Sequence, residues 1–346
     1  MPAHAPPVRL IVNPAAGGGK ARRLAPQAED VLRAHALTVH RADTRDLQHA
    51  RELAVQAARA GETVVVLSGD GAIGAVADAL RAVPEAVLGV LPGGRGNDLA
   101  RVLGVSADLR EACATIADGV VRAMDVGEVC PAPQEPHGSA FVGIASVGFD
   151  SDANRIANEA PSWLGGLVYA YGALKALASW KPARFEIELD PPGERHAFTA
   201  YTIGTANSKA YGGGMLAAPD AMLDDGLLEV IVLESVGKLA FLTKIFPKVF
   251  KGTHVNEPSV HVFRAREVSI SADRPFTMYA DGDPIGELPL RVRAVSAAVR
   301  VLVPAHSVAT PAFSRSSPLP AGRSQTVPPA FGRDDDQHAG EPADGP

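Results

Sequence analysis

Two glycine-rich loops that each carry an aspartate are the part of this chain best suited to chemistry. The loop Ser68-Gly69-Asp70-Gly71 follows the apolar run Thr63–Leu67, and the loop Pro92–Asp98 follows Val87–Leu91. Glycines let backbone N–H groups approach a phosphate closely, and the N-terminus of a following helix adds positive potential. Mg²⁺ is a hard ion that takes carboxylate and phosphate oxygens. The two loops therefore predict a site for a nucleotide polyphosphate with its metal.

Two other phosphate-binding patterns are matched only in part. Gly69–Gly74 reads G-x-G-x-x-G, but the dinucleotide fingerprint also needs an acidic residue after the next strand, and Pro92-Gly93-Gly94 stands there instead. Pro14–Ala21 resembles a P-loop, yet it lacks the leading glycine, and Ala21 replaces the metal-binding hydroxyl. An oxidoreductase is therefore the weakest alternative, and Walker-type chemistry is disfavoured.

The elements that position these loops alternate in type. The spacing of apolar residues predicts strands at Val8–Val12, Leu37–Arg41, Thr63–Leu67 and Val87–Leu91, and helices at Arg22–Ala36, Leu47–Ala60, Ala72–Arg81 and Asn97–Leu103. Such alternation is typical of a doubly wound parallel sheet, which binds its ligand at the carboxyl ends of the strands. After Gly127 we expect antiparallel strands at Phe185–Leu189, Phe198–Thr205, Leu227–Leu233 and Val268–Ser271. The predicted fold class is α/β, with an N-terminal parallel α/β domain, a C-terminal β-rich, sandwich-like domain and a nucleotide cleft between them.

Composition narrows the class of protein. The chain has 346 residues, enough for two domains, and a net charge of −6, which argues against nucleic acid as a partner. Its two cysteines have no metal-binding spacing and indicate no disulfide framework, and no signal peptide or membrane-spanning run is recognisable. A cytoplasmic location fits these features. From about Ser307 to Pro346 the composition predicts a disordered tail.

Seven motifs in order resemble the diacylglycerol kinase catalytic-domain family, which also includes sphingosine and ceramide kinases. They are Asn13-Pro14, Ser68–Ala72, Gly93–Arg101, Asp125-Val126-Gly127, Gly212–Met215 with Pro219, Asp224–Val230 and Asp281-Gly282-Asp283-Pro284. Each motif alone is weak evidence, but their ordered series spans about residues 8–304. The chain is similar to bacterial soluble lipid kinases of this family.

The resemblance implies an enzyme that uses ATP and Mg²⁺ to phosphorylate a lipid hydroxyl, most closely that of diacylglycerol. It implies a nucleotide-binding domain at 8–126, completed by a returning strand at 294–304, and a lipid-substrate domain at 127–293. The implied nucleotide-binding residues are Asn13, Gly69, Asp70, Gly71, Gly93, Gly94, Arg95 and Asn97. Asp70, Asp98 and Asp125 would form a network around Mg²⁺, Asp225 would hold a structural metal, and Asp283 would be the catalytic base.

The chain departs from the family pattern inside the loops that matter. Ser68 and Ala72 replace the glycine and threonine of G-G-D-G-T, and Arg95 replaces a hydroxyl residue of the second loop. Arg95 offers a cationic clamp on phosphate instead. Asp283 is shorter than the usual glutamate, which shifts the carboxylate by about 1.5 Å, and such a displacement can cost about a hundredfold in rate. The alternatives are a sphingoid or ceramide kinase, an NAD kinase and a catalytically impaired homologue.

The aspartates also have simpler structural interpretations. Asp70 and Asp98 stand where helix N-caps are favoured, and Asp125, Asp225 and Asp283 lie in sequences typical of turns.

Two segments bear on a lipid substrate. Val236–Gly252 is apolar and basic, with Lys244, Lys248 and Lys251 as predicted contacts to an anionic membrane surface, although Pro247 would kink a helix there. Trp163–Ala178 is apolar and is expected to be a packed helix. Peripheral membrane association follows from these features, and a homodimer stays an open alternative.

Overall fold

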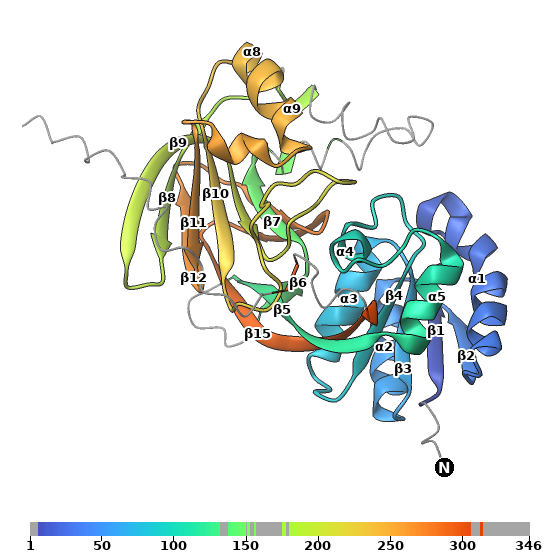
Figure 1. Ribbon diagram of the computed structural model, residues 1–346. Coiled ribbons are helices and arrows are strands. Elements are labelled where there is room, and N and C mark those ends of the chain that lie inside the picture. The colour runs from blue at the N-terminus through green and yellow to red at the C-terminus, as the bar shows by residue number, and fades with distance from the viewer. Residues whose placement is uncertain are drawn as a thin grey trace, which may run out of the picture. The chain divides into compact units, whose positions relative to one another are not determined.

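The first part of the chain alternates strands and helices as its apolar pattern predicts. The computed structural model describes residues 6–131, 138–149, 151–152, 156, 175–177, 180–305 and 312–313. Its early elements are β1 (Val8–Val12), α1 (Ala16–Ala34), β2 (Val39–Asp43), α2 (Leu47–Arg59), β3 (Thr63–Ser68), α3 (Asp70–Leu80), β4 (Val87–Pro92), α4 (Asp98–Val102) and α5 (Leu109–Asp118). The four strands are parallel in the order β4-β3-β1-β2 (Figure 1). Parallel sheets bury both faces, which explains why β3 and β4 are almost continuously apolar.

Some boundaries differ from the predicted ones for local reasons. Strand β2 begins at Val39 rather than Leu37, because Val8 of β1 pairs with Val39. Helix α1 begins at Ala16, with Gly17–Gly19 at positive φ inside it. Helix α5 is an addition to the predicted elements, and the Asp108 carboxylate caps it by accepting from the N–H groups of Arg110 and Glu111.

The second part of the chain is dominated by antiparallel strands. They are β5 (Val120–Cys130), β6 (Ser139–Phe141), β7 (Ile144–Gly148), β8 (Ala183–Leu189), β9 (Glu194–Ala206), β10 (Leu228–Glu234), β11 (Val260–Ala265), β12 (Glu267–Ala272), β13 (Thr277–Ala280), β14 (Asp283–Glu287) and β15 (Leu290–Val303). Four helical turns follow β10, namely α8 (Lys238–Ala240), η2 (Phe241–Ile245), α9 (Phe246–Val249) and η3 (Thr253–Asn256). The predicted fold class, a parallel α/β part followed by an antiparallel β-rich part, is confirmed.

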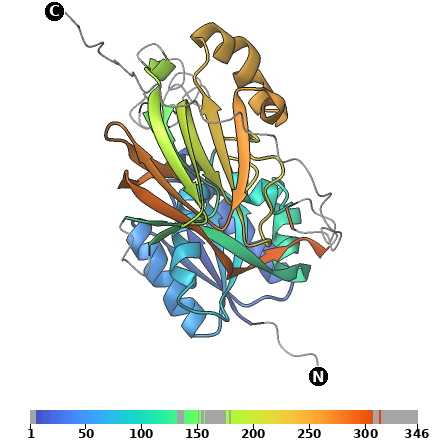
Figure 2. The same ribbon diagram turned by 90° about the vertical axis from the view of Figure 1, so that its left-hand side faces the viewer.

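Strands β5 and β15 link the two parts. They pair antiparallel along most of their length and lie side by side in both views (Figure 1, Figure 2). The end of β15 also pairs with β4 in parallel, through Arg300 opposite Val87 and Val301 opposite Leu88. The last strand therefore returns to the first sheet. The domain boundaries at 126 and 293 stay a prediction, because both strands run through both parts.

Separate apolar clusters support the two parts. Leu10, Val65, Leu67, Ile73 and Leu91 belong to the cluster that packs the parallel sheet against its helices. In the β-rich part, the buried apolar side chains of β8, β9, β10 and β12 form a second cluster. A third cluster, which includes Phe149, Trp180, Tyr201 and Phe241, packs strands against the helical turns. The segment Trp163–Ala178 lies outside the described residues except for 175–177, where Ala176 and Leu177 are buried.

Two residues of the predicted tail belong to the core of the α/β part. Ala312 and Phe313 are 2% and 4% exposed and join the first apolar cluster. The backbone N–H of Leu223 donates to the carbonyl of Ala312 at 2.7 Å, and the Arg122 guanidinium lies 4.8 Å from the Phe313 ring centroid. The ordered fold therefore extends past residue 307, and the other residues of the predicted tail lie outside the described ones.

We expect Phe313→Ala to lower the free energy of unfolding by about 3 kcal/mol, because it empties a buried aromatic position. Urea denaturation followed by circular dichroism measures the change. Phe250→Ala is the matched control, since Phe250 is 51% exposed. A loss no larger than that of the control would contradict the assignment of residue 313 to the core.

Candidate active site

The two predicted glycine loops contact each other through their backbones. They follow β3 and β4, which are neighbours, so that Ser68 pairs with Pro92 at the end of the strands. The N–H of Gly93 donates to the Ser68 carbonyl at 2.8 Å. A Cβ added to Gly94 would lie 2.3 Å from Cα of Gly69, a distance that no side chain tolerates. Only glycine fits at Gly94, and the predicted meeting of the loops is observed.

Asn97 shapes the second loop. Its Oδ1 accepts from the N–H of Gly94 at 2.7 Å, and its Nδ2 donates to the Gly94 carbonyl at 3.1 Å. Asn97 has φ of +53°, a left-handed conformation that asparagine tolerates better than most residues. These two bonds hold the loop closed at the start of α4.

Asp70 and Asp98 form a close pair of carboxylates. A Cβ added to Gly96 would lie 3.0 Å from Oδ2 of Asp70 and 3.1 Å from Oδ2 of Asp98. Burial raises the pKa of Asp70, and the nearby Asp98 charge raises it further. A divalent cation would relieve this repulsion and could bridge to phosphate oxygens, so the pair suits Mg²⁺.

Neither aspartate caps its own helix, so the simpler interpretation from the sequence does not apply. Asp70 Oδ1 accepts from the N–H of Leu99 in the other loop at 3.1 Å. Asp98 Oδ2 accepts from the N–H of Gly213 at 2.7 Å, and its Oδ1 accepts from Arg101. Asp98 thus ties the parallel sheet to the loop at Gly212–Gly214, whose three glycines all have positive φ.

Asp283, the predicted base, lies against the first glycine loop. It begins β14, and a Cβ added to Gly71 would lie 3.6 Å from its Oδ2. Burial raises the pKa of the Asp283 carboxyl, and the positive charge of Arg51 partly offsets that rise. A carboxylate near the predicted phosphate site can accept a proton from an acceptor hydroxyl.

Asp281 is a positioning residue that the sequence interpretation missed. Its carboxylate accepts from the N–H groups of Val142 at 2.8 Å and Gly143 at 2.9 Å, and its φ is +51°. A Cβ added to Gly74 of α3 would lie 3.0 Å from Asp281 Oδ2. Burial raises the pKa of Asp281 to about 6. Asp281 therefore fastens the turn that presents Asp283, and the Asp-Gly pair in the sequence was the available signal.

The first loop of the chain also reaches the glycine loops. A Cβ added to Gly17 would lie 2.5 Å from the carbonyl oxygen of Gly93. Asn13 Oδ1 accepts from the N–H of Ala15, and the N–H of Asn13 donates to the Leu67 carbonyl. Arg95 is exposed at the tip of the second loop. The predicted nucleotide-binding residues therefore come from three neighbouring loops.

Asp125 and Asp225 have hydrogen-bond partners of their own. Asp125 is 3% exposed, and its two oxygens accept from the N–H groups of Gly226 and Ala297, each at 2.7 Å. Asp225 Oδ2 accepts from Nη2 of Arg264 at 2.6 Å. Within the described ranges, no group of three His, Cys, Asp or Glu side chains is close enough to hold a metal.

Glu229, beside Asp225, predicts a pH dependence of stability. It is 4% exposed, and burial raises its pKa to about 7. Because the folded protein holds the Glu229 proton more tightly than the unfolded chain does, protonation of Glu229 stabilises the fold. This stabilisation is complete below the pKa of the unfolded chain, 4.5, and is lost as the pH rises through 7. We expect the free energy of unfolding to fall by about 1 kcal/mol more between pH 6 and pH 8 in the wild type than in Glu229→Gln. Urea titrations at both pH values test this, and equal pH dependence would contradict it.

The basic segment forms consecutive helical turns, α8, η2 and α9, with Pro247 in the last of them. Residues 241–245 form a π-helix directly before Pro247, which lies in the first turn of α9 and needs no N–H partner there. Phe241 and Ile245 are buried, whereas Leu239 and Phe250 are 75% and 51% exposed.

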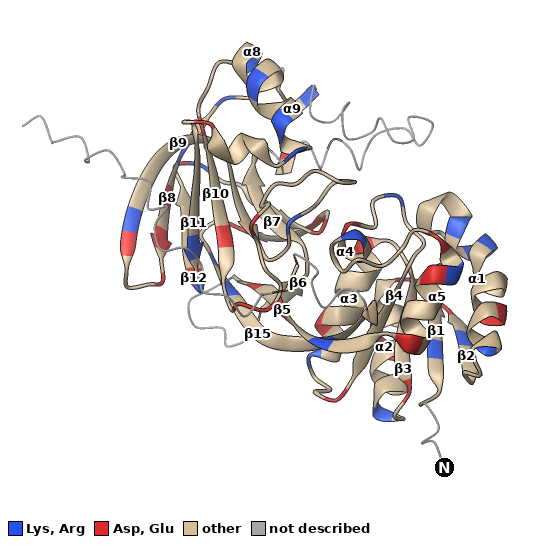
Figure 3. Cartoon of the chain, viewed as in Figure 1, with Lys and Arg blue, Asp and Glu red and all other residues tan. Residues whose placement is uncertain are grey.

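The lysines of this segment differ in their surroundings. Lys244 and Lys251 are exposed, and Lys248 pairs with Glu257. Figure 3 shows the basic residues on α8 and α9. Among the described helices, none is long and apolar enough to cross a membrane.

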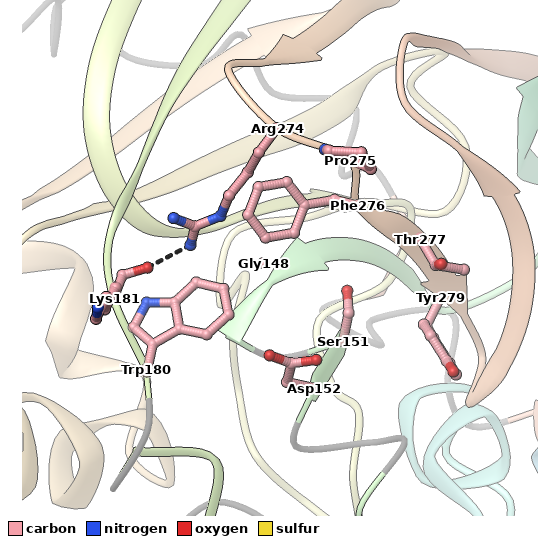
Figure 4. Close-up of a pocket in the computed structure, with 10 residues that line it drawn as sticks. All are labelled: Gly148, Ser151, Asp152, Trp180, Lys181, Arg274, Pro275, Phe276, Thr277 and Tyr279. Atoms are coloured by element: carbon pink, nitrogen blue, oxygen red, sulfur yellow. Dashed lines mark hydrogen bonds between the residues drawn. The ribbon is translucent and has the colours of Figure 1, made fainter.

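A cavity of about 420 Å³ lies beside β13 (Figure 4). Its lining includes Trp180, Lys181, Arg274, Phe276, Thr277 and Tyr279. The Arg274 guanidinium lies 5.0 Å from the Phe276 ring centroid and 5.8 Å from that of Trp180, and it donates to the Lys181 carbonyl. Strand β13 continues from Thr277 and Tyr279 into Asp281, so the cavity lies along the strand that leads to Asp283.

These features together define a class of protein. A parallel sheet with two glycine loops and a carboxylate pair suits nucleotide phosphate, and a third carboxylate from the β-rich part lies beside it. That is the arrangement of a phosphotransferase that acts on an acceptor hydroxyl.

Comparison with known proteins identifies the family. Residues 7–129 match the diacylglycerol kinase catalytic domain, and residues 143–303 match the YegS C-terminal NAD kinase beta sandwich-like domain. A Mycobacterium tuberculosis diacylglycerol kinase is 33% identical over 304 residues, which cover 86% of this chain and 96% of that protein. A Bacillus subtilis diacylglycerol kinase is 28% identical over 247 residues, which cover 70% of this chain and 78% of that protein.

Structural similarity extends over the same region. A crystal structure of a Bacillus anthracis diacylglycerol kinase has a TM-score of 0.67 and 22% identity, covering 87% of this chain and 98% of that one. The chain belongs to the diacylglycerol kinase family of lipid kinases, which transfer phosphate to an alcohol group. The resemblance seen in the motifs is thereby confirmed.

Proposed function

We propose that this protein transfers the γ-phosphoryl group of ATP to the hydroxyl of a lipid, with diacylglycerol as the acceptor and phosphatidic acid as the product. The observation that carries the proposal is the position of Asp283. Its carboxylate lies against Gly71 in the first glycine loop, although the two residues are far apart in the sequence. A base beside a phosphate site is what transfer to a hydroxyl requires.

In this proposal the three loops hold the nucleotide. The backbones of Gly69, Gly71, Gly93 and Gly94 would line the phosphates. The N–H groups of Gly69 and Gly71 would be the donors, because those of Gly93 and Gly94 already donate to Ser68 and Asn97. Asn97 keeps its loop in shape, and Asn13 and Arg95 contribute at the edges. Asp70 and Asp98 would hold Mg²⁺, which neutralises charge on the phosphates. Asp125 would join this network through water, because both of its oxygens already accept backbone hydrogen bonds.

Asp283 would take the proton of the acceptor hydroxyl. The hydroxyl oxygen forms a bond to the γ-phosphorus while the bond to the β–γ bridging oxygen breaks, and ADP leaves. Asp281 holds the base in place through the N–H groups of Val142 and Gly143. This hold compensates in part for the shorter side chain of aspartate, because its turn is fixed against α3.

The cavity beside β13 would receive the acceptor lipid. Trp180 and Phe276 give it an apolar wall, and Thr277 and Tyr279 line the strand toward Asp283 (Figure 4). Tyr279 pairs with Pro284 and Ala280 with Asp283, so the base lies one strand position beyond Tyr279 but on the opposite face of the strand pair from Thr277 and Tyr279. A lipid in this cavity would therefore have to pass the end of β13 to present its hydroxyl to the base.

The helical turns after β10 would dock on the membrane that supplies the lipid. Leu239 and Phe250 expose apolar surface, and Lys244 and Lys251 lie exposed in the same segment. Exposed apolar residues between cations suit an anionic bilayer surface. Lys248 contributes less in this arrangement, because it already pairs with Glu257.

We expect the double change Lys244→Gln and Lys251→Gln to weaken binding to anionic vesicles by at least about tenfold at low salt, since each lysine near such a surface contributes about 1 kcal/mol. Vesicle sedimentation measures the effect, which added salt should diminish. Lys248→Gln is the control and should change binding less. Unchanged binding of the double variant would remove this surface from the proposal.

A lipid screen tests the proposed activity directly. Purified protein with labelled ATP and Mg²⁺ is offered diacylglycerol, ceramide and sphingosine in mixed vesicles, and NAD in solution. We expect labelled phosphatidic acid. Label in ceramide or sphingosine would reassign the acceptor, and label in NAD would reassign the class of kinase. ATP binding with no transfer to any acceptor would indicate the catalytically impaired homologue.

A further inference from the structure

The position that the family resemblance assigns to a structural metal holds an arginine side chain in this protein. Asp225 lies in the loop before β10, and its Oδ2 accepts from Nη2 of Arg264 at 2.6 Å. Nε of the same guanidinium lies 3.1 Å from Oε1 of Glu229. One guanidinium therefore contacts both carboxylates, through a hydrogen bond to Asp225 and an ion pair without a hydrogen bond to Glu229.

Strand pairing fixes Arg264 in this place. Glu229 of β10 and Arg264 of β11 are directly opposite in an antiparallel pair, so both side chains lie on the same face of the sheet. The side chains of Glu229 and Asp225 are only 6% and 17% exposed, so they need a positive partner. The cation is thus supplied by the next strand of the chain.

The donor set does not fit a divalent ion. Mg²⁺ needs six oxygen ligands and Ca²⁺ six to eight. Oδ1 of Asp225 already accepts from the N–H of Leu227 at 3.1 Å, and Oδ2 accepts from Arg264. A metal there would also have to displace a permanently charged guanidinium that contacts both Asp225 and Glu229. At the Asp70–Asp98 pair, by contrast, Arg101 hydrogen-bonds to Asp98 and the repulsion between the two carboxylates remains.

The loop is held on both sides of Asp225 by hydrogen bonds within the chain. The N–H of Gly226 donates to Asp125, and the N–H of Asp125 donates to the Leu223 carbonyl at 2.6 Å. Arg122 lies 3.4 Å from Asp224. Arg122 and Arg264 therefore each place a positive charge beside one of the two aspartates of this loop, Asp224 and Asp225.

We propose that Arg264 is a built-in replacement for the structural metal, so that this loop folds and stays folded without a divalent ion. The guanidinium joins the loop to β10 and β11, as a metal bridging the same carboxylates would. Removing it should open a position that a divalent ion can fill, because Asp225 and Glu229 then lose the cation that contacts both of them. The inference concerns folding and stands whether or not the protein phosphorylates a lipid.

Thermal unfolding of the full chain without nucleotide tests the proposal. The difference in unfolding temperature between EDTA and Mg²⁺ or Ca²⁺ should be the same in the wild type and in Asp225→Asn, so that any effect of an ion held by Asp70 and Asp98 cancels. Arg264→Gln should unfold about 5 °C lower in EDTA, and millimolar Mg²⁺ or Ca²⁺ should restore part of that loss. Arg264→Lys keeps the charge and should respond less to metal. The double variant Asp225→Asn with Arg264→Gln should respond no more than the wild type does.

Several outcomes would overturn the proposal. The first is a wild type whose loss of stability in EDTA disappears in Asp225→Asn, or that binds Mn²⁺ at a site that Asp225→Asn removes. The second is a folded Arg264→Gln that neither ion stabilises, or that both ions stabilise equally without Asp225. If Arg264→Gln does not fold, Mn²⁺ titration of the wild type and of Asp225→Asn still tests the proposal. Equal Mn²⁺ binding by the two proteins supports it, and loss of a site in Asp225→Asn contradicts it.

Discussion

Asp283→Asn is expected to lower kcat for lipid phosphorylation at least about a hundredfold, because general base catalysis typically contributes 10²–10⁴. Asparagine keeps the size of the side chain but cannot accept the proton of the acceptor hydroxyl. ATP affinity should stay nearly unchanged, since Asp283 lies beside the first loop rather than in it. Steady-state kinetics with labelled ATP and nucleotide titration by fluorescence measure the two quantities separately.

Two further variants separate proton transfer from positioning. Asp283→Glu restores the longer carboxylate of the family pattern and should keep more activity than Asp283→Asn, since both carboxylates can act as a base although their positions differ by about 1.5 Å. Asp281→Ala removes the acceptor for the N–H groups of Val142 and Gly143 and should lower kcat while leaving the pH profile of the remaining activity in place. Near-normal turnover in Asp283→Asn would exclude Asp283 as the base, whatever its partners do.

The glycine loops and their meeting could be predicted because they depend on local features. Apolar, β-branched runs that end in glycine specify buried parallel strands, and neighbouring parallel strands deliver their loops to one edge of a sheet. The contact between Gly69 and Gly94 follows from that rule and the spacing alone. The family resemblance then placed Asp283 beside them, which neither periodicity nor composition could do.

The remaining features depend on contacts between distant parts of the chain. Asp125 has two acceptor oxygens, and only the fold decides that Gly226 and Ala297 fill them. Arg264 reaches Asp225 because β10 and β11 pair in one register. Phe313 lies in a segment whose composition predicts disorder, yet its ring fills a place in the core beside Arg122. Composition is an average over a segment, so it cannot show that one side chain of that segment is buried.

Gly94→Ala is expected to abolish nucleotide binding at working concentrations and to lower activity by at least about a hundredfold, the cost of misplacing reacting groups by about 1 Å. The added Cβ would lie 2.3 Å from Cα of Gly69 and 3.1 Å from Oδ1 of Asn97. The first neighbour is backbone and cannot turn aside, so the two loops must separate.

Separation of the loops breaks more than one contact. The hydrogen bonds between Asn97 and Gly94 hold the second loop, and Asp70 reaches Leu99 across the gap between the loops. Displacing Gly94 should therefore move Asp98 away from Asp70 and weaken any Mg²⁺ held between them. Overpacking of this kind also destabilises the fold by about 1–3 kcal/mol.

Gly237→Ala provides the matched control, since it adds the same methyl group where no atom lies within 4 Å. Calorimetric titration with ATP and Mg²⁺ measures affinity, and urea denaturation reports whether the variant is folded. A folded Gly94→Ala that binds ATP as the wild type does would mean that the nucleotide does not occupy these loops. If a folded Gly94→Ala loses ATP binding while Gly237→Ala keeps it, the phosphates bind at the backbone of the two loops. Gly69 and Gly94, which meet there, have no side chain that could bind them.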